Sequence, residues 1–282
     1  MVAATAAKTE SYVLGYSETE AQRLKLQAQL VRGWTERFFR AAGLDQLRGA
    51  PARVLDVGCG GGDVSMLAAD LAGPRVTVLG IDRDASSIEK ARARAAELGY
   101  ADRITFEQAD IAEFAPARTF DAVVGRYVLP YQRNAAASLQ RLAKCVKPGG
   151  LMVFHEIDCG GVPRMEGAPE LWNRVTTLLG EAFRRGGADP SFGLKLVPAF
   201  LNAGLGWPKV IAEVPVGGEP GSYLFQWLSS TIRSLLPLIE KSGLATAAEI
   251  DIDTLPARLE AASVGAKAQL IGPTQFGAWV SV

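Results

Sequence analysis

The sequence is poor in the residues that bind metals and form disulfides. His155 is the one histidine among 282 residues, and Cys59, Cys145 and Cys159 are far apart and lack CxxC spacing. Scattered thiols and a single imidazole speak against a zinc site, so we expect no metal. An odd number of distant cysteines speaks against a disulfide framework and suits a reducing compartment, which makes the cytoplasm the expected location.

An excess of one charge and a long apolar run are also missing. The chain carries 30 basic and 30 acidic side chains, so it lacks the one-sided charge of proteins that bind nucleic acids or membrane surfaces. The first ten residues, MVAATAAKTE, contain no long apolar region, and no run of about 18 apolar residues follows, so we expect neither a signal peptide nor a membrane span. The expected partner is a small molecule, with no nucleic acid and no membrane.

Short apolar runs alternate with helical stretches from Arg53 onward. The first five runs are VLDV, VTVLGI, ITFEQ, FDAVVG and LMVFHEI, and VIAEV and QFGAWV add a sixth and a seventh. Apolar strands separated by helices are typical of a doubly wound sheet. The sequence therefore predicts an α/β fold with a Rossmann-like, seven-stranded, mostly parallel doubly wound sheet.

The strongest functional signal is the glycine-rich turn after the first strand. In VLDVGCGGGD, the residues Gly58, Gly60 and Gly62 permit positive φ angles and a close approach of the backbone to a ligand. Ligands of such sheets bind outside the carboxyl ends of the strands, where this turn lies. A dinucleotide motif has a small residue where Asp63 stands, whereas Asp56 suits a cationic group, so we expect a positively charged ligand.

These residues resemble those of a known family. D-x-G-x-G-x-G, from Asp56 to Gly62, resembles the first motif of class I S-adenosylmethionine-dependent methyltransferases, and FDAVVGRY and KPGG resemble later motifs. The resemblance implies S-adenosyl-L-methionine as the cofactor, with Asp82 on the ribose hydroxyls and Asp110 and Ile111 on the adenine. The cofactor-binding residues predicted in this core are Asp56, Gly58, Gly60, Gly62, Asp82, Arg83, Asp110, Ile111 and Arg126.

Helical segments flank the core. We predict an N-terminal helical cover over residues 1–45, a cofactor-binding core over 46–215, a helical lid or substrate insertion over 216–271 before the last strand, and that strand over 272–282. The N-terminal segment resembles one that closes over the cofactor in small-molecule members near the ubiquinone and menaquinone methyltransferases. Tyr12, Arg23 and Gln27 are accordingly predicted to contact the cofactor. The alternative is a helix that docks on the sheet and leaves Glu20, Arg23 and Gln27 at its solvent-exposed edge.

His155 has two interpretations. It lies near the carboxyl end of the fifth strand, beside the expected methyl-transfer site, and an imidazole is a natural general base at neutral pH, so it is the candidate catalytic residue. It also alternates with Leu151 and Val153, which is the pattern of a side chain packed under a helix. Both interpretations stay open at this point.

The predicted substrate contacts are Tyr127, Tyr131, Glu156, Asp158 and Trp227. The alternative for each is a rim or packing role. Leu129-Pro130-Tyr131 faintly resembles the D/N-P-P-Y motif of base-amino methyltransferases, but Val128 and Leu129 stand in its first two positions, which speaks against a nucleic-acid base as the acceptor.

The sequence thus predicts a methyltransferase that acts on a small, partly apolar metabolite of the secondary-metabolite type, with oxygen slightly preferred as the acceptor because of His155. One alternative is C- or N-methylation of a quinone-, terpenoid- or amine-like molecule. Alternatives from other classes are a non-catalytic cofactor-binding partner subunit and an oxidoreductase, against which Asp63 speaks. The prediction allows a homodimer.

Overall fold

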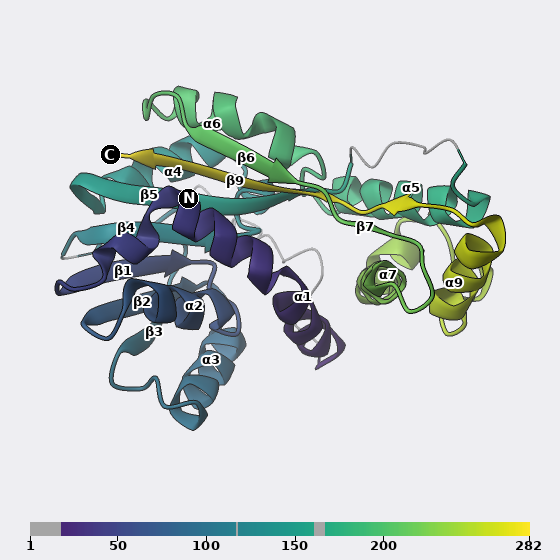
Figure 1. Cartoon of the computed structure of the whole chain (residues 1–282), viewed down its shortest axis with the longest axis horizontal. Coiled ribbons are helices and arrows are strands. Elements are labelled where there is room, and N and C mark those ends of the chain that lie inside the picture. The colour runs from purple at the N-terminus through teal and green to yellow at the C-terminus, as the bar shows by residue number, and fades with distance from the viewer. Residues whose placement is uncertain (1–17, 117, 161–166) are drawn as a thin grey trace, which may run out of the picture.

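The computed structural model describes residues 18–116, 118–160 and 167–282, with side chains described from residue 30 onward. Within these residues the main sheet has seven strands in the order β3-β2-β1-β4-β5-β9-β6 (Figure 1). The strands are β1 Ala52–Val57, β2 Val76–Asp82, β3 Ile104–Gln108, β4 Phe120–Arg126, β5 Val146–Asp158, β6 Lys209–Glu213 and β9 Thr274–Ser281. β9 runs antiparallel to β5 and β6, and the other pairs are parallel, which confirms the predicted fold class.

The strand order reverses between β1 and β4, which pair in parallel over four residues from Val54 and Ala122 onward. In sheets of this kind the connections leave such a point toward opposite faces, and ligands bind there, outside the carboxyl ends of the strands. The glycine-rich turn follows β1 at this point. The sheet therefore places the predicted motif at its ligand-binding edge.

Helices cover both faces of the sheet, because its strands are apolar on both sides. One face carries α1 Glu18–Ala42, α2 Asp63–Ala72 and α3 Ala85–Glu97, whose buried residues share a core with Val54, Val78 and Val153. The other face carries α4 Ala135–Ala143 and α6 Leu196–Asn202, packed against Phe154 and Met152. Single turns of 3₁₀ helix are η1 Leu44–Leu47, η2 Leu129–Tyr131 and η3 Phe192–Lys195.

A helical unit lies on the side toward which the parallel strands point (Figure 1). It consists of α5 Glu170–Arg185, α7 Tyr223–Lys241, α8 Ala247–Ile250 and α9 Leu255–Ala266, with the short strands β7 Val216–Gly217 and β8 Leu270–Ile271. Trp172, Leu179 and Phe183 of α5 share its core with Leu228 of α7. The unit thus includes α5, which the sequence placed in the core over 46–215, because the apolar side of α5 packs on α7 rather than on the sheet.

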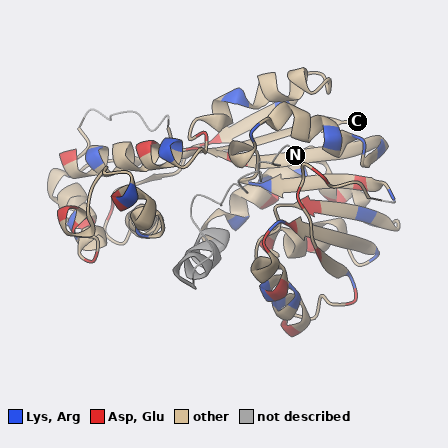
Figure 2. Cartoon of the chain, turned by 180° about the vertical axis from the view of Figure 1, so that it is seen from behind, with Lys and Arg blue, Asp and Glu red and all other residues tan. Residues whose placement is uncertain are grey.

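Basic and acidic residues are interspersed along the ribbon of both the sheet and the helical unit (Figure 2). This distribution matches the equal numbers of basic and acidic residues in the chain. Of the helices described, none is long and apolar enough to cross a membrane.

Candidate functional site

The turn after β1 has the backbone conformation that its glycines permit. Gly58, Gly60 and Gly62 have φ angles of 64°, 50° and 81°. A Cβ atom on Gly58 would lie 2.8 Å from Val128 Cγ2, and one on Gly62 would lie 2.9 Å from Phe106 Cζ, so neither position has room for a side chain. At Gly60 a Cβ would meet nothing within 4 Å. The turn is therefore tight at both ends and open in the middle.

Asp82 holds the middle of this turn against the end of β2. Its Oδ2 accepts a hydrogen bond from the backbone N–H of Gly60 at 3.0 Å, and its Oδ1 accepts one from the N–H of Asp84 at 3.0 Å. Burial raises the pKa of Asp82, and both backbone donors oppose that shift. Because a carboxylate offers about four lone-pair sites, Asp82 can still accept from two ribose hydroxyls. Arg83, also predicted to contact the cofactor, follows Asp82 in the turn between β2 and α3.

Asp56 is a buried acid with an unused oxygen. Its Oδ2 accepts from the Ser65 hydroxyl at 2.6 Å, whereas its Oδ1 has no hydrogen-bond partner among the residues described. Burial raises its pKa to about 7, against the hydrogen bond from Ser65 and the charge of Arg126. A cationic ligand group beside Oδ1 would stabilise the ionised form. Asp63, which replaces the small residue of a dinucleotide motif, pairs with Arg94 at 2.7 Å.

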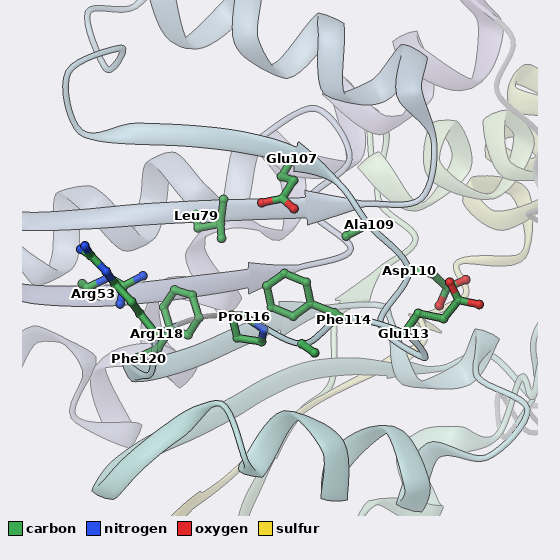
Figure 3. A pocket seen from close by; sticks show the side chains of 11 residues that line it. Arg53, Leu79, Glu107, Ala109, Asp110, Glu113, Phe114, Pro116, Arg118 and Phe120 are labelled. Atoms are coloured by element: carbon green, nitrogen blue, oxygen red, sulfur yellow. The ribbon is translucent and has the colours of Figure 1, made fainter.

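Asp110 and Ile111 follow β3, and Asp110 lies at one end of a groove of about 510 Å³ between the strands and the next loop (Figure 3). Asp110 is exposed and lies beside Glu113, whereas Arg53 and Arg118 line the far end. Ile111 is 8% exposed and belongs to the core. The two residues predicted to read adenine therefore lie at the same edge of the sheet as the glycine turn, while the groove itself extends away from that turn.

Tyr127, directly after β4, has a strained backbone that several contacts hold in place. Its φ angle is 57°, a left-handed conformation that costs roughly 1–2 kcal/mol for a residue with a side chain. Its N–H donates to the carbonyl of His155 at 2.9 Å, its hydroxyl donates to Gln275 Oε1, and its ring lies edge-on to the His155 ring at 5.1 Å. Strain of this kind is concentrated at functional sites.

His155 is fully buried between the sheet and α1. Its Nδ1 lies 2.9 Å from Thr35 Oγ1, its Nε2 lies 2.9 Å from Gln275 Oε1, and its ring packs edge-on against Phe38 at 4.9 Å. Burial lowers its pKa to about 3, and the charge of Arg126 adds to that shift.

The neighbours also fix which ring nitrogen of His155 carries the hydrogen. Gln275 Nε2 donates to the carbonyl of Pro273 at 2.9 Å, so Gln275 Oε1 faces the imidazole as an acceptor. His155 Nε2 must then donate, which leaves Nδ1 as the acceptor nitrogen, and it faces the Thr35 hydroxyl, whose one hydrogen also has the Val31 carbonyl as an acceptor at 3.1 Å. Nε2 thus already carries a hydrogen and Nδ1 is buried against Thr35, so neither nitrogen is placed to take a proton from a substrate. The structure thus favours the packed interpretation of His155 over the catalytic one.

Glu156 is fully buried on the opposite face of β5. Its Oε1 accepts from the backbone N–H groups of Val128 and Leu129 at 3.1 and 3.0 Å, and its Oε2 has no hydrogen-bond partner in the part of the chain that the structure describes. Burial raises its pKa to about 8, against those two donors. Asp158, two residues on and on the same face of the strand, is 3% exposed. Two predicted substrate residues are thus buried acids at one strand end.

The helical unit contributes the remaining predicted residues. Trp227 is 7% exposed and lies in the core of the unit, against which Tyr131 packs from η2. Tyr223, at the start of α7, contacts the ring of Trp34 on α1 with centroids 6.3 Å apart. Among the described residues of this unit, buried polar atoms without partners belong to Trp172, Ser222, Tyr223, Ser229 and Ser234. Such atoms require a polar ligand or ordered water.

The structure brings most of the predicted residues to one edge of the sheet. Tyr12 and the side chains of Arg23 and Gln27 lie outside the described residues, so their contacts with the cofactor stay predictions. Sequence reasoning missed Thr35 and Gln275. Gln275 had a signal, because it is the polar first residue of the segment QFGAWV that the sequence predicts as the last strand, whereas Thr35 had none. No group of three potential ligands among the described His, Cys, Asp and Glu residues could hold a metal ion.

Comparison with known proteins gives the following matches. The sequence model of a family described as "Methyltransferase domain" matches residues 50–183. The chain is 37% identical over 144 residues to the ubiquinone biosynthesis O-methyltransferase of Paracidovorax citrulli, covering 50% of this chain and 55% of the relative. It is 34% identical over 110 residues to the trans-aconitate 2-methyltransferase of Methylobacterium nodulans, covering 39% and 40%. The chain thus spans about half the length of the curated relatives it matches.

A solved structure with the same fold is that of an S-adenosylmethionine-dependent methyltransferase from Geobacter sulfurreducens in complex with S-adenosyl-L-homocysteine. The TM-score is 0.50 with 20% identity, and the match covers 88% of this chain and 91% of that one. At this identity the likeness shows the fold alone. The family match, by contrast, includes every strand motif from Asp56 to Asp158.

Proposed function

Since residues 50–183 belong to the class I S-adenosylmethionine-dependent methyltransferase family, we propose that the protein moves the methyl group of S-adenosylmethionine to a small, partly apolar metabolite. The observation that carries this proposal is the open middle of the glycine turn, with Asp56, Asp82 and Asp110 around it at the strand ends. The sulfonium supplies an already activated methyl group, so the main task of the chain is to hold two molecules in line.

Each residue at the strand ends has a role in this proposal. Asp82 would hold the ribose hydroxyls, Asp110 and Ile111 would contact the adenine, and the unpaired Oδ1 of Asp56 would face the cationic part of the ligand. Arg126, half-buried beside Asp56, is suited to the carboxylate of the methionine portion because a guanidinium matches a carboxylate in shape and charge. These assignments follow from the chemistry of the donors and acceptors that line the edge.

The acceptor would bind between the ends of β4 and β5 and the helical unit. The buried aromatic rings there suit an apolar body, and the unpaired hydroxyls of α7 suit polar substituents. We favour oxygen as the acceptor atom, because a relative is named a ubiquinone biosynthesis O-methyltransferase. His155 no longer supports this choice. C- or N-methylation of a quinone-, terpenoid- or amine-like molecule is the second candidate, and the proposed location is the cytoplasm.

The test is a methyl-transfer assay with S-adenosylmethionine that carries an isotopically labelled methyl group, run against phenols, hydroxy acids, quinols and amines. We expect label in an organic-extractable product, and at least a tenfold lower rate for Asp82→Ala. Asp102→Ala, an exposed aspartate at the amino end of β3, is the matched control and should retain the rate. Tight cofactor binding without label transfer to any acceptor class would instead favour the non-catalytic partner subunit.

A further inference from the structure

Glu156 is the buried acid that the cofactor set leaves without a role. It is fully buried at the carboxyl end of β5, and its Oε2 is one of the buried oxygens without a partner among the described residues. A buried polar oxygen that lacks a partner is rare in folded proteins and calls for a ligand, a water or a proton. Glu156 is therefore the strongest sign of an unassigned contact in the strand-end region.

The other oxygen of Glu156 ties this carboxyl group to the glycine turn. Oε1 accepts from the N–H groups of Val128 and Leu129, and the side chain of Val128 lies against Gly58, where an added Cβ would come within 2.8 Å. Glu156 also lies close enough to Tyr127 for its charge to raise the pKa of that hydroxyl. The carboxyl group is thus placed between the cofactor turn and the predicted acceptor residues.

We propose that Glu156 is a catalytic residue whose Oε2 accepts the proton of an O–H acceptor during methyl transfer. This inference rests on the proposed function and deepens it, because it names an acceptor with an ionisable hydroxyl. The O–H bond of the acceptor breaks and its proton goes to Oε2. The electron pair of the acceptor oxygen forms the new bond to the methyl carbon, while the carbon–sulfur pair stays on sulfur, so charge and atoms balance.

The surroundings of Glu156 make its ionisation sensitive to a nearby cation. The titratable groups nearest to it are Tyr127 at the end of β4, whose hydroxyl interacts with both Glu156 and Cys159, and Asp158 on its own strand, which is also buried. Burial raises the pKa of Glu156 to about 8, so Glu156 is mostly protonated at neutral pH unless a cation lies beside it. A sulfonium beside it favours the carboxylate, which is the form that can accept a proton.

The experiment is a calorimetric titration of the full chain at pH 8 in two buffers of different ionisation enthalpy, with S-adenosylmethionine and with S-adenosylhomocysteine. The two ligands share their amino and carboxyl groups and differ in the sulfonium, so the difference in proton release reports the group beside the methyl. We expect S-adenosylmethionine to release about half a proton more, because Glu156 is half ionised near its pKa. Asp56, with a pKa of about 7, is already mostly ionised at this pH.

Glu156→Gln is the matched variant, since its amide oxygen can still accept from Val128 and Leu129 while the ionisable oxygen is gone. It should bind both ligands and lose the difference in proton release. Equal proton release for both ligands in the wild-type protein, or an unchanged difference in the variant, would overturn the proposal. If neither ligand binds the wild-type protein, the proposed function itself fails. If the variant does not fold, the difference in proton release between the two ligands in the wild-type protein still tests the proposal.

Discussion

The strand ends have a proposed cofactor side, around the glycine turn and Asp82, and a proposed acceptor side, around His155, and different kinds of contact hold the two sides together. On the cofactor side, the backbone N–H of Gly60 donates to the carboxylate of Asp82, 22 residues further along the chain. On the acceptor side, His155 is 120 residues from both Thr35 and Gln275 and meets them through side chains. The first side is therefore sensitive to backbone conformation, and the second is sensitive to the loss of single side-chain hydrogen bonds.

The largest loss of stability and of cofactor affinity should come from adding one methyl group to the glycine turn on the cofactor side. In Gly58→Ala the left-handed φ of 64° and the approach to Val128 at 2.8 Å both oppose the new Cβ, so we expect a loss of about 3 kcal/mol in the free energy of unfolding. Affinity for S-adenosylhomocysteine should fall at least tenfold. Urea unfolding and calorimetric titration measure the two effects.

Gly99→Ala is the control for that variant, because Gly99 also has a positive φ, 77°, but a Cβ there would meet nothing within 4 Å. Gly99→Ala should lower the free energy of unfolding by about 1 kcal/mol and leave the affinity for S-adenosylhomocysteine unchanged. If both variants lose the same free energy of unfolding, the loss in Gly58→Ala comes from the left-handed backbone conformation alone and not from the contact with Val128.

On the acceptor side, the largest expected effect is the pH dependence that His155 contributes. The unfolded chain binds a proton at His155 near pH 6.5, whereas the folded protein does so only near its pKa of about 3. The unfolded state therefore binds more protons between these values, and the free energy of unfolding falls as the pH is lowered through this range. From pH 7 to pH 5 the wild-type protein should lose about 2 kcal/mol more than His155→Gln. Identical pH dependence in urea unfolding would contradict the buried neutral imidazole.

The two sides also differ in how far the sequence could predict them. Gly58, Asp82 and Asp110 stand in a local motif at the ends of short apolar strands, so their positions follow once the strands are recognised. The alternation in β5 left open whether His155 is a base or a packed residue. That question depends on Thr35 and Gln275, whose positions are set by the docking of α1 and the pairing of β9. Contacts between segments that are distant in the sequence leave no local sequence pattern, so these two partners of His155 could not be predicted.

Thr35→Val tests whether the acceptor side depends on single side-chain hydrogen bonds, and its expected effect on stability is smaller. Valine keeps the shape of threonine but removes the hydroxyl that lies between His155 Nδ1 and the Val31 carbonyl, which should cost about 1 to 2 kcal/mol in the free energy of unfolding. Thr77→Val, at an exposed position of β2, is the matched control and should change stability by less than about 0.5 kcal/mol. If both variants unfold at the same urea concentration as the wild-type protein, the contact between Thr35 of α1 and His155 contributes nothing measurable to stability.

The smallest effect should come from a side chain inside the glycine turn. Cys59 is buried, and burial raises the pKa of its thiol, so the thiol is not activated as a nucleophile. In Cys59→Ala the affinity for S-adenosylhomocysteine should change by less than about twofold, because the backbone and not this side chain shapes the turn. A loss of tenfold or more would mean that the Cys59 side chain, and not only the backbone around it, shapes the glycine turn.

The strand-end edge around Asp82 is the proposed binding site for S-adenosylmethionine. The most direct test is calorimetric titration of folded, ligand-free protein with S-adenosylhomocysteine and with NADH, together with the Asp82→Ala variant. The account predicts 1:1 micromolar or tighter binding of S-adenosylhomocysteine, at least tenfold weaker in the variant, and no binding of NADH. Absence of binding to S-adenosylhomocysteine, or binding of NADH that depends on Asp82, would contradict it.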